Sequence, residues 1–462
     1  MISRRAWAGL LSTALTLLVM VQPGQAVASF TTLVLSKTVG PPTTRLGAQG
    51  SGFGPSEVVD LTFDVSPLAK ARTDPTGSFT RKIAVPASAL PGDHTITATG
   101  EQSGLSASAG FTVRTDWPMF RFSLNRTGHN PYENVVDTSN VGSLVTKWAQ
   151  NCCGEITTSP AVVGGVVYAG DGEGQFYAAD ADTGTILWQV TLGNQGVISP
   201  LVAGGVVYVG TATNGILDAL DAGTGRVIWS KAYGGGVFDS PVLWNGMLYV
   251  WFDNGNLYAL DSRTGNVLWS VPNMPNSPVA LAGGVIYVGT QTFKVEALDA
   301  RTGHLLWKTP VADLVDATPA VAGGVVYAAT TNIGAYKVYA LDASTGEILW
   351  THNIGAVEAS PAVADGVLYV GSLDGWLHAY DAASGTLIWS VKTGDAIWAS
   401  PAVANGVVYV GSHDNIFYAF DAASGTKLWT YSIGGWTSSP VIADGVLYVG
   451  SWDKNLYAFA LP

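Results

Sequence analysis

Three side chains suited to ligand binding occupy one equivalent position in successive repeats of the sequence. Asp316, Glu358 and Trp398 each stand two residues before a Ser-Pro or Thr-Pro pair, so a regular stacking of the repeats brings them side by side. Carboxylates accept hydrogen bonds, and indole faces stack on the apolar faces of sugars or attract cations. The sequence therefore predicts a binding face for a protein, a sugar or a cation. Loops of the same and neighbouring repeats extend this predicted face with Trp376, His413, Asp414, Trp436, Trp452 and Asp453.

The same position carries other chemistry elsewhere in the chain. The remaining repeats place Thr157, Val197, Phe238, Pro275 and Thr437 there. A position that changes freely within an otherwise regular repeat is a candidate for function, although a solvated loop rim is the alternative interpretation. The repeats with Val197 and Pro275 offer little polar chemistry and serve as internal comparisons.

No set of residues predicts a catalytic site. The six histidines are scattered, and neither a Ser/His/Asp order nor a glycine-rich phosphate loop is present. The only two cysteines, Cys152 and Cys153, are adjacent, which excludes a chelating Cys-x-x-Cys metal site. In an oxidising compartment they can close a small, strained vicinal disulfide, with a reactive surface loop as the alternative.

Internal repetition organises the C-terminal two-thirds of the chain. The proline of each Ser-Pro or Thr-Pro pair recurs at intervals of 37 to 42 residues, at Pro160, Pro200, Pro241, Pro278, Pro319, Pro361, Pro401 and Pro440. Each of the eight units contains short apolar, β-branched runs separated by turn pairs such as Asp365-Gly366, which predicts four antiparallel strands. Such a unit cannot bury both faces alone, so we expect the units to stack radially into an eight-bladed β-propeller.

A tryptophan marks the outer strand of each predicted blade. It follows an Asp-x-x-Thr/Ser-Gly turn, whose Asp is expected to cap turn amides, and the indoles are expected to pack between neighbouring blades. These residues are Trp188, Trp229, Trp269, Trp307, Trp350, Trp389 and Trp429. The eighth repeat ends at Pro462 without this strand, whereas residues 143–150, with Trp148, precede the first repeat. We expect residues 143–150 to complete the last blade and close the ring.

The segment Ala297-Leu-Asp-Ala-Arg-Thr-Gly-His-Leu-Leu-Trp307 resembles the tryptophan-docking motif of quinoprotein dehydrogenases. The leader Asn125-Arg-Thr-Gly-His-Asn130 is also similar to the segment that enters the propeller in that family, and the resemblance extends over about residues 116–462. It implies a fold of PQQ-like repeats, which serves enzymes, assembly scaffolds and sensor domains alike. For an enzyme it further implies pyrroloquinoline quinone (PQQ) with Ca²⁺ and a vicinal cysteine pair against the quinone. Here the cysteines lie about seven residues before Ser159-Pro160, where the family pair falls, and no long insertion between strands is present to roof a pocket.

The N-terminal part of the chain has a different character. Residues 1–28 are typical of a secretory signal peptide, with Arg4 and Arg5 before an apolar stretch; a retained membrane anchor is the alternative. Residues 29–115 lack tryptophan and alternate apolar residues, as at Val59, Leu61 and Phe63, which predicts an immunoglobulin-like β-sandwich of six or seven strands. A linker at 116–142 and the propeller at 143–462 complete the predicted domains.

Composition agrees with an all-β extracytoplasmic protein. Only 12% of the residues are charged, and the formal net charge of −12 argues against nucleic acid or an anionic membrane as the main partner. The predicted function is a secreted, monomeric, non-enzymatic binding protein with no membrane span in the mature chain and a protein or carbohydrate ligand. The alternatives are a PQQ-dependent alcohol or sugar dehydrogenase and an envelope-assembly scaffold similar to the propeller lipoprotein of the outer-membrane barrel-assembly machinery.

Overall fold

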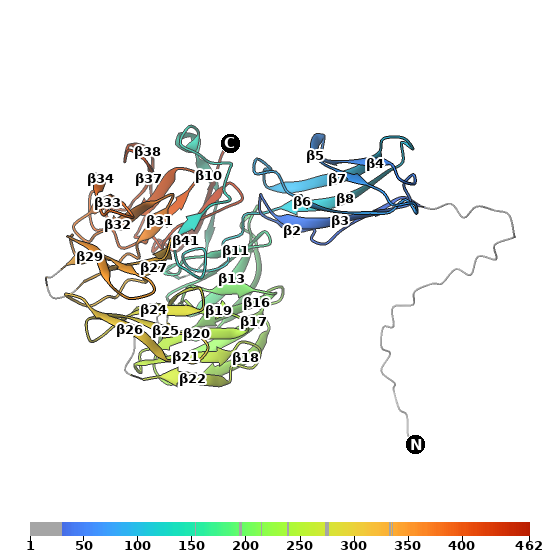
Figure 1. The fold of residues 1–462 in the computed structure, drawn as a ribbon. Coiled ribbons are helices and arrows are strands. Elements are labelled where there is room, and N and C mark those ends of the chain that lie inside the picture. The colour runs from blue at the N-terminus through green and yellow to red at the C-terminus, as the bar shows by residue number, and fades with distance from the viewer. Residues whose placement is uncertain are drawn as a thin grey trace, which may run out of the picture. The chain divides into compact units, whose positions relative to one another are not determined.

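The computed structural model describes residues 30–462 except 153, 194–195, 214, 238–239, 273–276, 332–333 and 335, and almost all of its regular structure is β-strand (Figure 1). The predicted signal peptide, residues 1–28, lies outside the described residues. Two compact units are present, a smaller one of residues 30–38, Arg45–Ala84 and His94–Phe111, and a larger one of Val39–Thr44, Val85–Asp93 and Thr112–Pro462. No helix among the described residues is long and apolar enough to cross a membrane.

The N-terminal strands form two sheets, which confirms the predicted immunoglobulin-like sandwich. The three-stranded sheet has the order β1 (Thr32–Leu35), β3 (Arg45–Ser51), β6 (Phe79–Ala84). The five-stranded sheet has the order β2 (Val39–Gly40), β8 (Ser106–Val113), β7 (Gly92–Gly100), β4 (Val58–Phe63), β5 (Ser66–Arg72). Eight strands therefore replace the expected six or seven. Val59, Leu61 and Phe63 alternate into the core, each at most 5% exposed, as their spacing predicted.

The rest of the chain confirms the predicted eight-bladed propeller. Blades 1 to 4 are β11–β14 (Ala161–Val163, Val166–Gly170, Gln175–Asp180, Ile186–Thr191), β15–β18 (Leu201–Ala203, Val206–Gly210, Ile216–Asp221, Val227–Ala232), β19–β22 (Val242–Trp244, Met247–Phe252, Asn256–Asp261, Val267–Val271) and β23–β26 (Ala280–Ala282, Val285–Thr290, Lys294–Asp299, Leu305–Pro310). Blades 5 to 7 are β27–β30 (Ala320–Ala322, Val325–Ala329, Lys337–Asp342, Ile348–Asn353), β31–β34 (Ala362–Ala364, Val367–Gly371, Trp376–Asp381, Leu387–Lys392) and β35–β38 (Ala402–Ala404, Val407–Gly411, Ile416–Asp421, Lys427–Ser432). Blade 8 consists of β39 (Val441–Ala443), β40 (Val446–Gly450), β41 (Asn455–Ala460) and β10 (Val145–Asn151). A short strand β9 (His129–Asn130) adds to blade 7, and a 3-10 turn, η1 (Val141–Ser143), precedes β10.

Each blade begins with the same tight hairpin. The first and second strands are joined by two residues with positive φ, for example Asp365 (49°) and Gly366 (79°). Two consecutive positive-φ residues match the right-handed twist of the flanking strands and favour Gly, Asn and Asp. The repeated Asp-Gly, Asn-Gly and Gly-Gly pairs therefore determine the strand boundaries locally.

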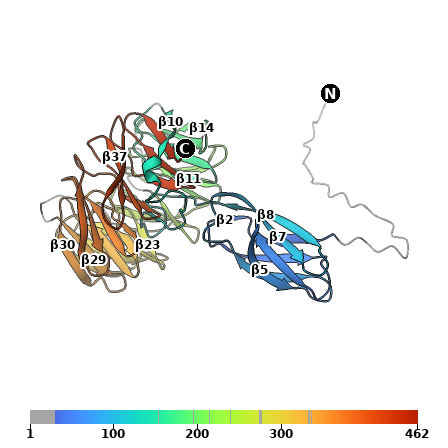
Figure 2. The same ribbon diagram turned by 90° about the horizontal axis from the view of Figure 1, so that it is seen from above.

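Strand β10 closes the ring. It pairs antiparallel with β41, so that residues about 310 positions apart in the sequence form one sheet, and the teal β10 lies beside the red C-terminal strands in both views (Figures 1 and 2). The first strands of neighbouring blades contact one another in succession from β23 through β27, β31, β35, β39, β11 and β15 to β19, so β39 and β11 meet across the closure. The predicted closure of blade 8 by residues 143–150 is confirmed by this pairing.

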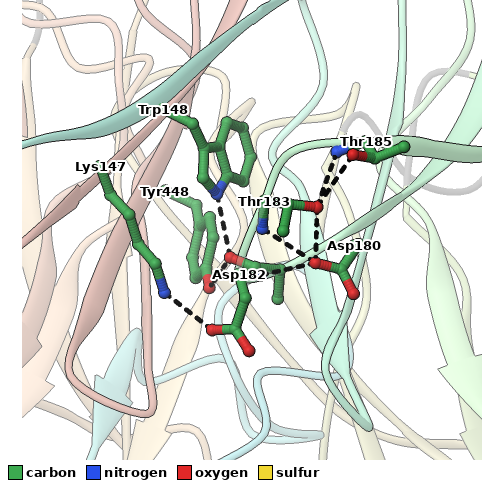
Figure 3. A network of polar contacts seen from close by, with 8 residues as sticks. Lys147, Trp148, Asp180, Asp182, Thr183, Thr185 and Tyr448 are labelled. Atoms are coloured by element: carbon green, nitrogen blue, oxygen red, sulfur yellow. Dashed lines mark hydrogen bonds and ion pairs between the residues drawn. The ribbon is translucent and has the colours of Figure 1, made fainter.

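Figure 3 shows the seam between blade 8 and blade 1. The indole Nε1 of Trp148 donates a hydrogen bond to the carbonyl oxygen of Ala181 at 3.0 Å, and the Tyr448 hydroxyl donates to the same oxygen at 3.3 Å. Lys147 forms an ion pair with Asp182 at 2.8 Å. One Asp180 oxygen accepts hydrogen bonds from the backbone N–H and the hydroxyl of Thr183, which fixes the turn that receives the indole.

The same docking is repeated around the ring. An indole N–H on the outer strand donates to a backbone carbonyl of the following blade at 2.9–3.3 Å for Trp148, Trp188, Trp229, Trp307, Trp350, Trp389 and Trp429. Trp269 differs, because its N–H has no partner among the described residues. The repeated Asp before the turn caps turn amides, as Asp261 does for Thr264 at 2.8 Å.

Residues 117–130, called the leader below, contact the innermost part of all eight blades. Backbone N–H groups of Val162, Val202, Leu281, Val321, Val363 and Val403 donate to successive leader carbonyls at 2.8–2.9 Å. The Asn130 amide reaches Ile442 O in blade 8 at 2.8 Å, and Arg126 reaches Ser240 O in blade 3 at 2.6 Å. The leader is therefore part of the propeller interior rather than a free linker.

Two buried arginines anchor the leader to the blades. Arg126 is fully buried and donates to the carbonyls of Val279, Phe120 and Ser240 at 2.6–3.0 Å. Arg121 is 3% exposed and donates to the carbonyls of Pro361 and Pro401. Burial, with a smaller contribution from Arg126, lowers the pKa of Arg121 to about 9. Both guanidinium groups therefore bind backbone carbonyls that lie far apart in the sequence.

Truncation of the closing tryptophan tests the seam. We expect Trp148→Ala to lower the free energy of unfolding of the propeller by about 3 kcal/mol, since it removes a docked indole and its hydrogen bond. The measurement is denaturant unfolding followed by circular dichroism. Trp376→Ala is the matched control, because Trp376 stacks on His378 of its own strand and should cost much less. Equal losses in the two variants would contradict the proposed role of the seam.

The leader is tested separately. Arg126→Ala leaves the carbonyls of Val279 and Ser240 without this donor, and we expect a loss of about 3 kcal/mol in unfolding free energy. Arg301→Ala removes a guanidinium that lies over the Trp244 ring, 5.8 Å from its centroid, and should change stability by less than about 1 kcal/mol. A neutral effect of Arg126→Ala would mean that the leader does not hold the blades together.

Candidate functional site

A cavity of about 460 Å³ lies where the loops before the innermost strands converge. All eight blades contribute to its lining, through residues such as Thr157, Val197, Ser240 and Pro278, and Phe120 of the leader also lines it. We call this space the channel cavity. Its size falls within the range of small-molecule sites.

Hydroxyl groups tie neighbouring blades together around the channel cavity. The backbone N–H of Ser159 donates to Ser199 Oγ, and the N–H groups of Ser360 and Ser400 donate to Ser400 Oγ and Ser439 Oγ, all at 2.9 Å. The sequence revealed the Ser-Pro pairs only as a period marker. The sequence did offer a signal for these hydrogen bonds. A polar residue that recurs beside the buried innermost strand of each blade needs a hydrogen-bond partner.

Blades 7 and 8 supply a continuous row of aromatic rings, Trp398, His413, Trp436 and Trp452, called the aromatic wall below. Ring centroids are 5.1 Å apart for Trp398 and His413, 3.9 Å for His413 and Trp436, and 4.5 Å for Trp436 and Trp452. The first two pairs are stacked, with interplanar angles of 21° and 1°. The three indoles remain 37–48% exposed, although they line the cavity. Burial lowers the pKa of His413, an effect opposed by Asp395, so the wall is uncharged at neutral pH.

Blades 5 and 6 supply two carboxyl groups beside this wall. Asp316 and Glu358 both line the channel cavity. Burial, then the charges of Glu358 and Asp313, raise the pKa of Asp316 to about 6, and burial raises the pKa of Glu358. Oδ1 of Asp316 is buried without a hydrogen-bond partner among the described residues. The pair therefore combines like charges with incomplete solvation.

The structure thus gathers most of the sequence-predicted face into one cavity. Asp316, Glu358, Trp398, His413, Trp436 and Trp452 line it, as does Thr157. Val197 and Thr437 also line it, but they pack on Gly170 and Gly411 as Ile397 packs on Gly371, so they occupy the buried position before the variable one. Phe238 and Pro275 lie outside the described residues.

Three residues of the predicted face lie outside the cavity lining. One Asp414 oxygen accepts from the N–H of Gly394 at 2.7 Å and from the Tyr418 hydroxyl at 2.6 Å. Asp453 accepts in the same way from Gly434 N–H at 3.0 Å and from the Tyr457 hydroxyl at 2.7 Å. Trp376 stacks on His378 with the Lys392 ammonium 5.6 Å from its ring centroid. These side chains order their own loops and strands.

The cysteine pair does not contribute to the cavity lining that the structure describes. Cys152 is buried, and its backbone N–H donates to Lys454 O at 3.0 Å. Cys153 lies outside the described residues, so the vicinal disulfide stays a prediction. In the described part of the chain, no three His, Cys, Asp or Glu side chains are grouped so as to hold a metal ion.

The chemistry of the cavity does not match PQQ. This quinone is a tricarboxylate, and its binding requires cationic or N–H donor groups that compensate three negative charges. The described lining of the channel cavity contains two carboxyl groups and neither Lys nor Arg. We therefore derive no chemical step through the quinone.

Comparisons with known proteins agree with this architecture. A family profile, PQQ_2, described as outer membrane protein assembly factor BamB, matches residues 134–272, 214–336 and 334–461. A macroglobulin-like domain profile matches residues 28–113. A search of curated proteins returned no match.

Solved structures share the propeller at low sequence identity. Quinohemoprotein alcohol dehydrogenase from Comamonas testosteroni superposes with a TM-score of 0.65 at 16% identity, over 75% of this chain and 80% of that one. BamB from Moraxella catarrhalis superposes with a TM-score of 0.60 at 19% identity, over 69% of this chain and 99% of that one. A europium-containing methanol dehydrogenase superposes with a TM-score of 0.64 at 16% identity, over 75% of this chain and 98% of that one. At these identities the likeness concerns the fold, which enzymes and non-enzymes share.

The raised pKa of Asp316 makes a stability prediction. Between about pH 4, the unfolded-state pKa, and about pH 6, the folded state binds the proton more tightly, so ionisation of Asp316 lowers stability as pH rises through this window. The difference in unfolding free energy between Asp316→Asn and wild type should therefore increase by about 1 kcal/mol, in favour of the variant, from pH 4.5 to pH 7.5. This figure allows for solvent screening. Denaturant unfolding at both pH values measures this gain. Glu173→Gln, an exposed carboxylate, is the control, and an equal gain there would contradict the assignment.

Proposed function

The chain belongs to the PQQ-type repeat family described as outer membrane protein assembly factor BamB, and from that premise we propose that it is a non-enzymatic binding protein of the extracytoplasmic space. The channel cavity is its ligand site. The observation that carries this proposal is the aromatic wall, three indoles 37–48% exposed in a cavity that also contains two carboxyl groups.

The distribution of large side chains supports this site. The variable position holds Thr157 in blade 1, but Asp316, Glu358 and Trp398 in blades 5 to 7. Docking of the blades uses a different set of tryptophans, so the ring does not require indoles at the cavity. Contiguous exposed aromatic surface is costly in water and marks interaction sites on soluble proteins. One sector of an otherwise regular ring is therefore specialised for binding.

A protein-assembly role is the second candidate. It is favoured by the family match over residues 134–461, because the description of that family names an outer membrane assembly factor. In that case the ligand of the channel cavity is a side chain of a partner protein. A quinone-dependent dehydrogenase is less well supported, because the described cavity lining offers no cationic group to the quinone carboxylates.

Substitutions in the cavity test the binding function. Trp398→Ala and Glu358→Ala should each weaken capture of the ligand at least tenfold, since they remove an indole face and a charged acceptor at the site. Glycan arrays and pull-downs from an envelope extract provide the measurement. Glu173→Gln, which changes an exposed carboxylate outside the cavity lining, is the control.

Two results would contradict the proposal. If all three variants keep the same ligands at unchanged affinity, the channel cavity is not the binding site and the N-terminal sandwich becomes the better candidate. If PQQ with Ca²⁺ strongly raises the thermal midpoint and the protein then reduces a dye with alcohols or aldoses, it is an enzyme.

A further inference from the structure

We propose that the channel cavity recognises an organic cation, an ammonium or guanidinium group held by Asp316 and Glu358 against the aromatic wall. This inference rests on the proposed function of the cavity and specifies the chemical class of its ligand. The group belongs either to a free amine or to a Lys or Arg side chain of a partner protein, two sources with one chemistry.

The charge distribution is the first argument. The titratable groups of the described lining are Asp316, Glu358 and His413, and Asp313 and Asp395 lie close behind them. The whole chain has a formal net charge of −12, which steers cations toward it. Two negative groups with no resident cation in the described lining create a local potential that a positively charged ligand relieves.

One arginine of the leader lies beside a residue of the cavity lining. The guanidinium carbon of Arg126 is 5.7 Å from the ring centroid of Phe120, the leader residue that lines the cavity. Arg126 donates to backbone carbonyls of the leader and the blades, and it is not itself part of the described lining.

The carboxyl and hydroxyl oxygens of the cavity can accept hydrogen bonds from N–H groups. Besides the two carboxyl groups, Ser240 and Thr318 line the cavity, are at most 3% exposed, and have hydroxyls without a hydrogen-bond partner among the described residues. Ammonium and guanidinium groups carry three and five N–H donors and no acceptor. Charge-assisted hydrogen bonds to carboxylates are stronger than those a neutral hydroxyl forms.

The aromatic wall adds a second attraction of the same sign. Indole faces attract cations electrostatically, most strongly when the cation is partly desolvated. His413 is stacked within the wall, and its lowered pKa keeps it neutral, so it does not repel a cation at pH 7. A neutral sugar would also stack on these indoles, but it would leave the like charges of Asp316 and Glu358 unopposed.

Calorimetric titration and thermal shift of the full chain at low ionic strength test the inference. The probes are N-acetyl-lysine amide, N-acetyl-arginine amide and ethanolamine, with N-acetyl-norleucine amide, cellobiose and Ca²⁺ for comparison. We expect at least one organic cation to bind ten times more tightly than norleucine amide. Tighter binding of a Lys- or Arg-containing peptide than of the capped residue would identify a partner protein as the source, and tighter binding of ethanolamine would identify a free amine.

Matched variants link binding to the cavity. Asp316→Asn and Glu358→Gln keep side-chain size and should each weaken cation binding at least tenfold, whereas Glu173→Gln, an exposed carboxylate outside the cavity lining, should leave it unchanged. Circular dichroism and the thermal midpoint establish that the variants are folded. Wild-type affinity should fall as pH drops from 7.5 to 5, since Asp316 then takes up a proton beside Glu358, Asp313 and His413.

The outcomes separate this inference from the proposed function. Binding of cellobiose or norleucine amide as tightly as the organic cations, or binding of Ca²⁺ by the wild type while no organic cation binds, would overturn the assignment to an organic cation. Neutral ligands whose binding is lost in Trp398→Ala would overturn the inference but leave the channel cavity as a binding site. Ligand binding that is unchanged in every cavity variant would overturn both the inference and the proposed function of the cavity.

Discussion

The antiparallel pairing of β10 with β41 is the constraint on which the propeller depends. It joins the segment that precedes the first repeat to the end of the last one, and it places Trp148 on the carbonyl of Ala181 in blade 1. Each four-stranded blade buries its faces only against its neighbours, so an open ring would expose two apolar faces and two strand edges. Closure therefore stabilises all eight blades at once, and it also creates the central channel in which the cavity lies.

The leader gives this channel its specific interior. It contacts every blade, and its buried arginines bind carbonyls of loops from blades 3, 4, 6 and 7. Backbone carbonyls just before the first strand of a blade lie outside the sheet and need other hydrogen-bond donors. The arginines of the leader donate hydrogen bonds to several of them. The same segment places Phe120 in the lining of the channel cavity. Ring stability and the shape of the site thus share one structural element.

Some positions of the repeat are nearly invariant, whereas one position varies from blade to blade. Turn aspartates and docking tryptophans hardly vary, because the aspartates cap turn amides and the indoles, Trp269 excepted, donate a hydrogen bond toward the next blade. The residue two positions before each Ser/Thr-Pro pair neither caps a turn nor docks on the next blade. A carboxyl group, an indole or a threonine is therefore tolerated there. Because equivalent positions converge on the axis, differences between distant parts of the sequence become neighbours in one cavity. Asp316, Glu358 and Trp398, about 40 residues apart in succession, line the same space.

Local physics in the sequence determined the blade count, the hairpin turns, the closing strand and most of the candidate face, since these depend on short-range turn conformations and on the register of a repeat. The sequence did not reveal the route of the leader, the hydroxyl contacts of the Ser-Pro pairs or the stacking of His413 between two indoles, because these depend on which blades meet. It also grouped Asp414 and Asp453 with the ligand face, whereas tertiary structure pairs them with Tyr418 and Tyr457. Periodicity specifies which residues are equivalent. Only the closed ring decides which of them face the cavity and which hold their own loops, because side-chain direction and hydrogen-bond partners arise from contacts between strands that the repeat pattern does not contain.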